Sequence, residues 1–282
     1  MTIIENKNFP SERALYGANE VELKNCTFQG EEDGESALKE ARNILLKDCY
    51  MDLRYPLWHD ENVALERVEM TANCRAALWY STRIVIDNSK LHGIKALREC
   101  SDIELKNTSV ISPEFGWRNH RIVGKNLSVE GEYGFFESSN IHLSNLKFKG
   151  KYSFQYVHNL VIEDSDLDTK DAFWHTKNVL VKNSVVKGDY LAWYAEDITF
   201  ENCTIIGTQP LCYCKNLTLV NCKMVDCDLS FEYSDVNADI IGEVMSVKNP
   251  KSGQIVADGY GEILLTNDSK VRCEAKIIKR GK

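Results

Sequence analysis

The chain has 282 residues, with 42 acidic and 34 basic side chains and a formal net charge of −8. This acidic balance and a pI of about 5.4 argue against nucleic acid as a partner, because phosphate binding needs a basic surface. No apolar run reaches the length of a signal peptide or a membrane span, so we expect a cytoplasmic protein with no membrane partner.

A short motif recurs from residue 20 to residue 235, after a head that ends at Asn19. It is plain in Asn178–Val186 and returns at 19-residue intervals from Asp197 and from Asn216. We call the sixth residue of each copy the marker; the markers are Asn25, Asp48, Arg67, Asn88, Asn107, Asn126, Asn145, Asp164, Asn183, Asn202 and Asn221. The steps between markers are uneven up to Asn88, and from there on they are all equal. A fixed period of this kind is typical of a solenoid.

Apolar residues alternate around each marker. They stand four and two residues before it, as in Val179 and Val181, three after it, as in Val186, and ten before it, as in Phe173. This period of two predicts strands with one buried face, and three such segments in each copy leave no room for a helix. We predict an all-β, single-stranded parallel β-helix of about eleven coils, with three short strands per coil and an internal ladder of stacked Asn markers. A leucine-rich repeat, the main alternative, has a longer period.

The Asn ladder, the coil length and the three-strand rhythm of residues 20–235 resemble the right-handed β-helix of the pectin-lyase-like superfamily. The head residues Glu12–Leu15 and the tail residues Val247–Gly253 and Ala257–Gly259 are similar to a bacterial domain-of-unknown-function family of that fold. That family implies no established reaction, so the resemblance assigns no catalytic residue.

The two ends of the repeat are expected to be capped, because a bare terminal coil exposes strand edges and core. Residues 1–19 are the predicted N-terminal cap. Residues 236–282 are the predicted C-terminal cap, with additional strands in Glu243–Val247 and Glu262–Leu265. Since the repeat is unbroken between them, we predict one domain in all.

The ten cysteines are best explained by packing. Cys26, Cys49, Cys203 and Cys222 each follow a marker, where other copies have Ser or Thr, and reduced thiols fit that position and a cytoplasmic protein. Cys212 and Cys214 lack the C-x-x-C spacing of common zinc sites. We therefore predict no metal site and no cofactor.

Two columns in the third segment hold the most informative side chains. The residues nine before each marker, here called the tryptophan column, are Trp58, Trp79, Arg98, Trp117, Phe136, Gln155, Trp174, Trp193 and Cys212. The residues eight before it, here called the tyrosine column, are His59, Tyr80, Glu99, Arg118, Glu137, Tyr156, His175, Tyr194 and Tyr213. The core already has a column one step earlier, so at least one of these two faces outward.

An outward column of this kind suits a carbohydrate. Sugar rings stack on aromatic side chains, their hydroxyls bond to charged ones, and a repeated surface suits a poly- or oligosaccharide. The predicted substrate-binding residues are Trp58, His59, Trp79, Tyr80, Arg98, Trp117, Phe136, Tyr156, Trp174, Trp193 and Tyr194. Two alternatives stay open: packing between coils alone, and a structural β-helix that binds a protein or a second copy of itself through the same residues.

Catalysis is left open by the sequence. If the chain is an enzyme, a polysaccharide hydrolase or lyase is the predicted class, with Glu99, Arg118, Glu137 and His175 as candidate catalytic residues. Two coils of about 4.8 Å would place the Glu99 and Glu137 backbones about 9.6 Å apart, close to the carboxyl separation in inverting glycosidases. Arg118 between them favours their charged forms, which suits a base. The neighbours His59–Asp60 and His175–Asp171 are alternative acid–base pairs.

Overall fold

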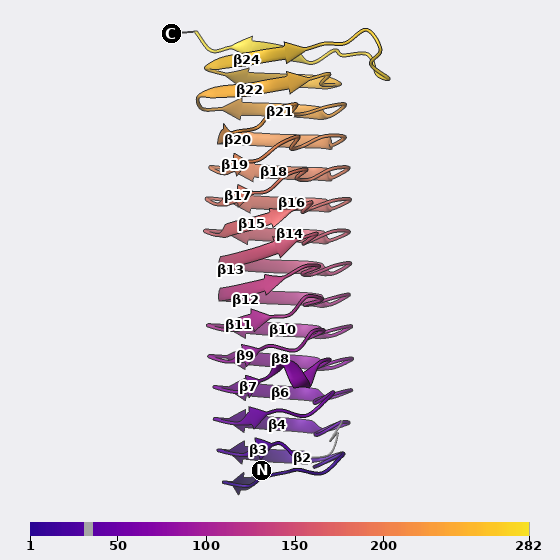
Figure 1. Cartoon of the computed structure of the whole chain (residues 1–282), viewed down its shortest axis with the longest axis vertical. Helices are drawn as coiled ribbons and strands as arrows, with labels where there is room; N and C mark the ends of the chain where they lie inside the picture. The colour runs from indigo at the N-terminus through magenta and orange to yellow at the C-terminus, as the bar shows by residue number, and fades with distance from the viewer. Residues whose placement is uncertain (31–35, 282) are drawn as a thin grey trace. The chain divides into compact units, whose positions relative to one another are not determined.

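The computed structural model describes residues 1–30 and 36–281. The chain divides into two compact units, Met1–Lys147 and Phe148–Lys282, and each is described by itself. In each unit the chain winds into stacked turns of parallel strands (Figure 1). The described residues form about 14 turns at a spacing of about 19 residues, which confirms the predicted parallel β-helix and adds turns to the eleven predicted.

The first unit repeats one long and one short strand in each turn. The long strands are β2 (Asn19–Lys24), β4 (Arg42–Lys47), β6 (Glu61–Glu66), β8 (Thr82–Asp87) and β10 (Ser101–Lys106), and the short ones are β3 (Thr27–Phe28), β5 (Tyr50–Met51), β7 (Glu69–Met70), β9 (Lys90–Leu91) and β11 (Ser109–Ile111). Strand β1 (Thr2–Glu5) pairs with β2, β12 (His120–Gly131) joins both strand types, and the 3-10 helix η1 (Ala72–Cys74) follows β7. Strand β13 (Ser139–Lys151) continues from this unit into the next.

The second unit repeats the same pattern. Its strands are β14 (His158–Glu163), β15 (Asp166–Lys170), β16 (Lys177–Lys182), β17 (Val185–Lys187), β18 (Glu196–Glu201), β19 (Thr204–Ile206), β20 (Lys215–Val225), β21 (Asp235–Ile240), β22 (Glu243–Lys248), β23 (Ser252–Ala257), β24 (Gly259–Leu264) and β25 (Lys276–Lys279). Strands β21, β23 and β25 extend the stack that β20 belongs to, and β22 pairs with β24.

Equivalent residues of consecutive turns pair in register, as the repeat predicts. Ile84 of β8 pairs with Val63 of β6 on one side and with Ile103 of β10 on the other. All three side chains are buried, so each apolar column of the sequence becomes a continuous strip of core. In the second unit the rings of Phe154 and Phe173 stack in the same way, with centroids 5.2 Å apart.

The third segment of each turn is a run of bends, so the prediction of three strands per turn is corrected to two. Leu57 and His59 have φ angles of 62° and 60°, and the equivalent residues of other turns are also positive. Left-handed residues at such short intervals break an extended backbone, and only isolated bridges such as Trp79 to Arg98 remain. Each non-glycine residue held this way costs roughly 1–2 kcal/mol, which the buried Leu57 side chain helps to offset.

The Asn ladder exists but lies on the outside, which corrects the predicted internal position. Asn126 donates to Asn107 over 2.9 Å and Asn145 donates to Asn126 over 2.8 Å, yet all three residues are exposed. Their positive φ angles make the bend, and the bend interrupts the inward–outward alternation so that the residue after each marker is the buried one. A second exposed ladder stands five residues before the markers, where Asn62 donates to Asn43 and Asn178 to Asn159.

Candidate functional site

The tryptophan column is half-buried and closes the corners between turns. Five indole N–H groups each donate to a backbone carbonyl 16 to 18 residues ahead, over 2.6 to 2.8 Å; the donors are Trp58, Trp79, Trp117, Trp174 and Trp193. Gln155 makes the same bond through its amide nitrogen. The N–H edge of each of these side chains therefore holds the following turn in place, a role that the sequence pattern alone did not indicate.

The faces of these rings are covered by their neighbours. Trp58 and Trp79 stack with centroids 5.0 Å apart, and the Arg98 guanidinium lies 4.6 Å from both Trp79 and Trp117. Phe136 packs on Trp117 at 5.1 Å, and in the second unit Trp174 stacks on Trp193 at 5.3 Å. A sugar ring cannot insert between rings this close, because the gap holds no further layer of atoms.

The tyrosine column is the exposed one. In the first unit His59 stacks on Tyr80 with centroids 4.8 Å apart. In the second unit His175 lies between Tyr156 and Tyr194, 5.0 Å from each, and Tyr194 stacks on Tyr213 at 4.7 Å. The fractional exposures of Tyr80, Tyr156 and Tyr194 are 37%, 43% and 47%, so a large part of each residue is in contact with solvent.

Three candidate catalytic residues form an ion ladder in the first unit. Arg118 lies 2.7 Å from Glu137 and 3.7 Å from Glu99, and all three side chains are 40% to 53% exposed. Hydrogen bonding to Glu137 raises the pKa of Arg118. The ladder is thus a solvent-exposed ion network, in which Arg118 forms an ion pair with each of the two carboxylates.

His175, the fourth candidate catalytic residue, belongs to the second unit and is held by the two tyrosine rings. The predicted acid–base partners of His175 and His59 are Asp171 and Asp60, and both face away from the surface on which the histidines lie. Asp171 and Asp60 are 6% and 2% exposed, whereas His175 and His59 are exposed. The structure therefore does not bring these pairs together at one surface.

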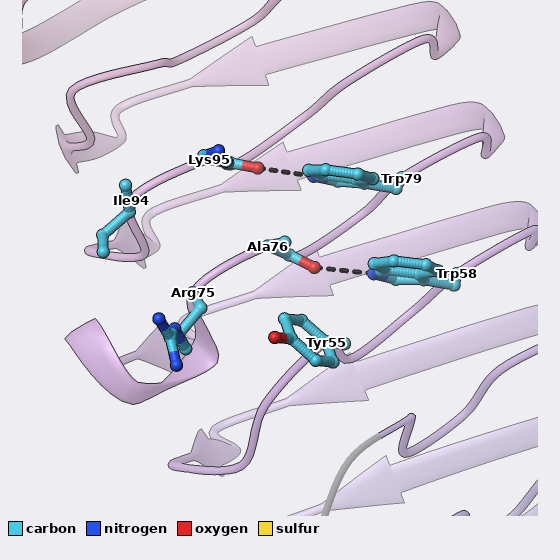
Figure 2. Close-up of a pocket in the computed structure, with 7 residues that line it drawn as sticks. All are labelled: Tyr55, Trp58, Arg75, Ala76, Trp79, Ile94 and Lys95. Atoms are coloured by element: carbon cyan, nitrogen blue, oxygen red, sulfur yellow. Dashed lines mark hydrogen bonds between the residues drawn. The ribbon is translucent and has the colours of Figure 1, made fainter.

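A pocket of about 260 Å³ opens beside the tryptophan column in the first unit (Figure 2). Its lining residues are Tyr55, Trp58, Arg75, Ala76, Trp79, Ile94 and Lys95. The two indole rings lie one above the other with their N–H groups directed to the carbonyls of Ala76 and Lys95, and Tyr55 is tilted by 49° against Trp58. The site thus combines indole edges, a phenol, an exposed aliphatic group and two cations.

The pocket exists because one turn departs from the period. The step from Arg67 to Asn88 is longer than the regular step by two positions, and the extra length forms η1, whose C-cap residue Arg75 has a φ of 46°. The equivalent positions of the next turns carry the larger Lys95, Glu114 and Tyr133. Ala76 leaves the space beside Trp58 open.

Five lining residues were missed by the sequence analysis: Tyr55, Arg75, Ala76, Ile94 and Lys95. The irregular step and the small side chain of Ala76 were the available signals. Nowhere in residues 1–30 and 36–281 does a group of three His, Cys, Asp or Glu side chains suit a metal ion. The same residues contain no helix with the length and apolar character needed to cross a membrane.

A protein-family model matches residues 2–278, and its description is "Protein of unknown function (DUF3737)". The chain belongs to the DUF3737 family. The predicted membership of an uncharacterised β-helix family is thereby confirmed. A comparison with curated proteins gives no match for this DUF3737 chain.

Solved structures similar to this DUF3737 chain include the A-module of the mannuronan C-5 epimerase AlgE6 from Azotobacter vinelandii. It is 10% identical, with 99% of this chain and 89% of that chain covered and a TM-score of 0.37. PfbA, a surface adhesin of Streptococcus pneumoniae, is 8% identical, with coverages of 88% and 85% and a TM-score of 0.40. Identities and TM-scores this low carry no functional conclusion for this chain.

Proposed function

We propose that this DUF3737 protein binds carbohydrate, with the pocket around Ala76 as its principal contact. The observation that carries the proposal is the pocket itself, since aromatic, aliphatic and cationic side chains converge there on a space large enough for a sugar ring. Tyr55 and the indole edges supply apolar contact, and Arg75 and Lys95 supply hydrogen-bond donors for hydroxyl oxygens.

The exposed pair His59 and Tyr80 extends this surface beyond the pocket. The imidazole and the phenol lie on the turns that carry Trp58 and Trp79, and Tyr80 meets both indoles edge-on at about 6 Å. Their polar edges can bond to hydroxyls of a second sugar unit. Stacking of sugar on the rest of the tryptophan column is not part of the proposal, because those ring faces are covered.

A glycan array followed by isothermal titration calorimetry on any hit tests the proposal. Ala76→Tyr should fill the pocket and abolish binding while the thermal melt stays within a few degrees of the unsubstituted protein. Tyr16→Ala, which removes an exposed ring outside the pocket, is the matched control and should bind as before. No hit on the array, or a hit that Ala76→Tyr binds equally well, would reject carbohydrate binding at this pocket.

Self-association is a second candidate, and it is favoured by the tyrosine column of the second unit. Tyr156, His175 and Tyr194 form an exposed strip of rings whose centroids lie 5.0 Å apart, too close for a ligand to insert between them. Strips of this kind suit the surface of a second copy or another protein. Sedimentation velocity over a range of protein concentrations should reveal a dimer that Tyr194→Ser weakens; a monomer at all concentrations would reject self-association.

A further inference from the structure

We infer that the pocket takes one sugar ring that carries an anionic group, at an end or a branch of the glycan. This inference rests on the proposed carbohydrate binding and specifies which sugar unit is bound. It follows from three properties of the pocket: its closure by neighbouring turns, its size and its charge.

The closure comes from the turns on either side of Ala76. Tyr55 N donates to the Cys74 carbonyl and Lys95 N donates to the Arg75 carbonyl, so the turns of Tyr55 and Lys95 flank the turn of Ala76. The side chains of Tyr55 and Lys95 therefore bound the pocket along the direction in which the turns stack (Figure 2). A polymer running in that direction would have to pass through these side chains, whereas a single ring can enter from the open side.

The size agrees with one ring. A space of about 260 Å³ lies just below the usual range for sites that hold a drug-sized molecule. The space beside Ala76 corresponds to the one that a larger side chain, such as that of Tyr133, fills at the equivalent position of another turn. The occupant is therefore expected to be one ring with small substituents.

The charge of the lining is positive. Arg75 is exposed, and no ion pair to it is found among the described residues, so its guanidinium can bind a ligand anion. Lys95 lies 3.5 Å from Glu114, but Glu114 is shared with Arg98 at 2.7 Å, which leaves one positive charge uncompensated in that trio. No carboxylate lines the pocket. A carboxylate, phosphate or sulfate on the sugar would complement this charge.

Calorimetry with three single-ring probes tests the inference: glucuronate, glucose 6-phosphate and glucose. We expect both anionic sugars to bind at least about tenfold more tightly than glucose, a difference that added salt reduces. Arg75→Gln should remove that difference, and Lys125→Gln, which neutralises an exposed lysine of β12, should keep it. Ala76→Leu should reduce binding of all three sugars, and it serves as a second blocking variant if Ala76→Tyr fails to fold.

The outcomes separate this inference from the proposed function. Equal binding of glucose and the anionic sugars, or an unchanged preference in Arg75→Gln, would overturn the anionic group while carbohydrate binding stands. Tighter binding of an oligosaccharide whose anionic units are all internal than of one with an anionic end would overturn the end or branch recognition. Binding of no probe, single-ring or oligomeric, would overturn both proposals.

Discussion

The turn that carries Trp58 and the turn that carries Trp117 share one backbone plan and differ in what fills it. Both indoles donate to a carbonyl of the following turn, Trp58 to Ala76 over 2.6 Å and Trp117 to Tyr133 over 2.7 Å. Tyr133 packs its ring edge-on against Trp117 at 6.1 Å, whereas Ala76 leaves the pocket. The indole hydrogen bond is therefore kept in both turns, whereas the two extra residues that form η1 and the small side chain of Ala76 leave the first corner open.

The same two turns differ inside the fold. Asn119 accepts from Cys100 N over 2.8 Å and donates its amide to the Leu97 carbonyl over 3.0 Å. Asp60, at the equivalent place, accepts from Ala41 N over 2.8 Å, but its buried Oδ2 atom has no hydrogen-bond partner. Burial, together with the nearby charge of Glu40, raises the pKa of Asp60 to about 8, although the hydrogen bond from Ala41 N opposes the shift. A protonated Asp60 can donate as Asn119 does.

The largest expected effect is that of Asp60→Asn, which would give both turns an amide side chain at the same buried position. A folded-state pKa near 8 lies above the unfolded value, so the contribution of Asp60 to stability is lost as pH rises from about 4 to about 8. Asn does not titrate, and we expect the variant to be more stable at pH 7 by on the order of 3 kcal/mol. Urea denaturation of both proteins at pH 5, 7 and 9 measures this difference.

The reverse substitution, Asn119→Asp, is its control. It should destabilise the protein increasingly as pH rises, because it places a second carboxyl in the buried position. Other carboxylates, such as Asp48 and Asp102 with their lowered pKa values, are common to both proteins and cancel in the comparison. A stability difference between Asp60→Asn and the unsubstituted protein that is the same at every pH would contradict a neutral Asp60.

The next effect is that of Tyr133→Ala, which opens the closed corner. Removing a half-buried ring should cost about 2 kcal/mol, because the ring's contact with Trp117 is lost. Tyr16→Ala, at a residue 54% exposed, should cost less than about 0.5 kcal/mol. Thermal denaturation of both variants compares them, and equal losses would mean that Tyr133 does not close the corner.

A smaller effect tests what the two turns share. Trp58→Phe and Trp117→Phe each remove the indole N–H and leave a carbonyl unpaired, and each should cost about 1 kcal/mol. Denaturant titration of the two variants measures both losses. Clearly unequal losses would show that the common hydrogen bond does not have a common role.

The smallest effects are expected at the outer corners of the two turns. Asn126→Ala breaks two ladder bonds, and Arg67→Ala breaks an exposed ion pair with Asp48. We expect losses of about 1 kcal/mol for the first and less than about 0.5 kcal/mol for the second. Melting curves at low and high salt distinguish them, since only the Arg67 contribution should fall with salt.

The sequence predicted those features of the fold that follow from the period alone. Turns of equal length stack in register, so Val63, Ile84 and Ile103 had to share one buried strip. The outward position of the Asn ladder did not follow, because the period does not say on which side of a bend the marker lies. The bends of the third segment did not follow either. Leu57 and Phe135 have positive φ angles, although a left-handed backbone is usually indicated by Asn or Gly.

The candidate site was predicted only in part. We expected the rings of Trp58 and Trp79 and the charge of Arg98 to face a ligand. Neighbouring side chains of the same column cover these ring faces instead. The pattern of aromatic residues revealed which column was special and could not reveal how much of each ring stays free. Ala76 was not predicted, because a small residue becomes informative only when it is aligned with the larger residues at the equivalent positions of other turns.

The extra residues of η1 leave the strands around them undisturbed. Strands β6 and β8 keep the same pairing, from Glu61 with Thr82 to Glu66 with Asp87, as strands separated by regular turns. Length can therefore be added at one corner without shifting any other turn. Such a fold can acquire a new recognition feature by a local insertion and can lose it by deletion, which makes this corner a natural position for engineering altered ligand preference.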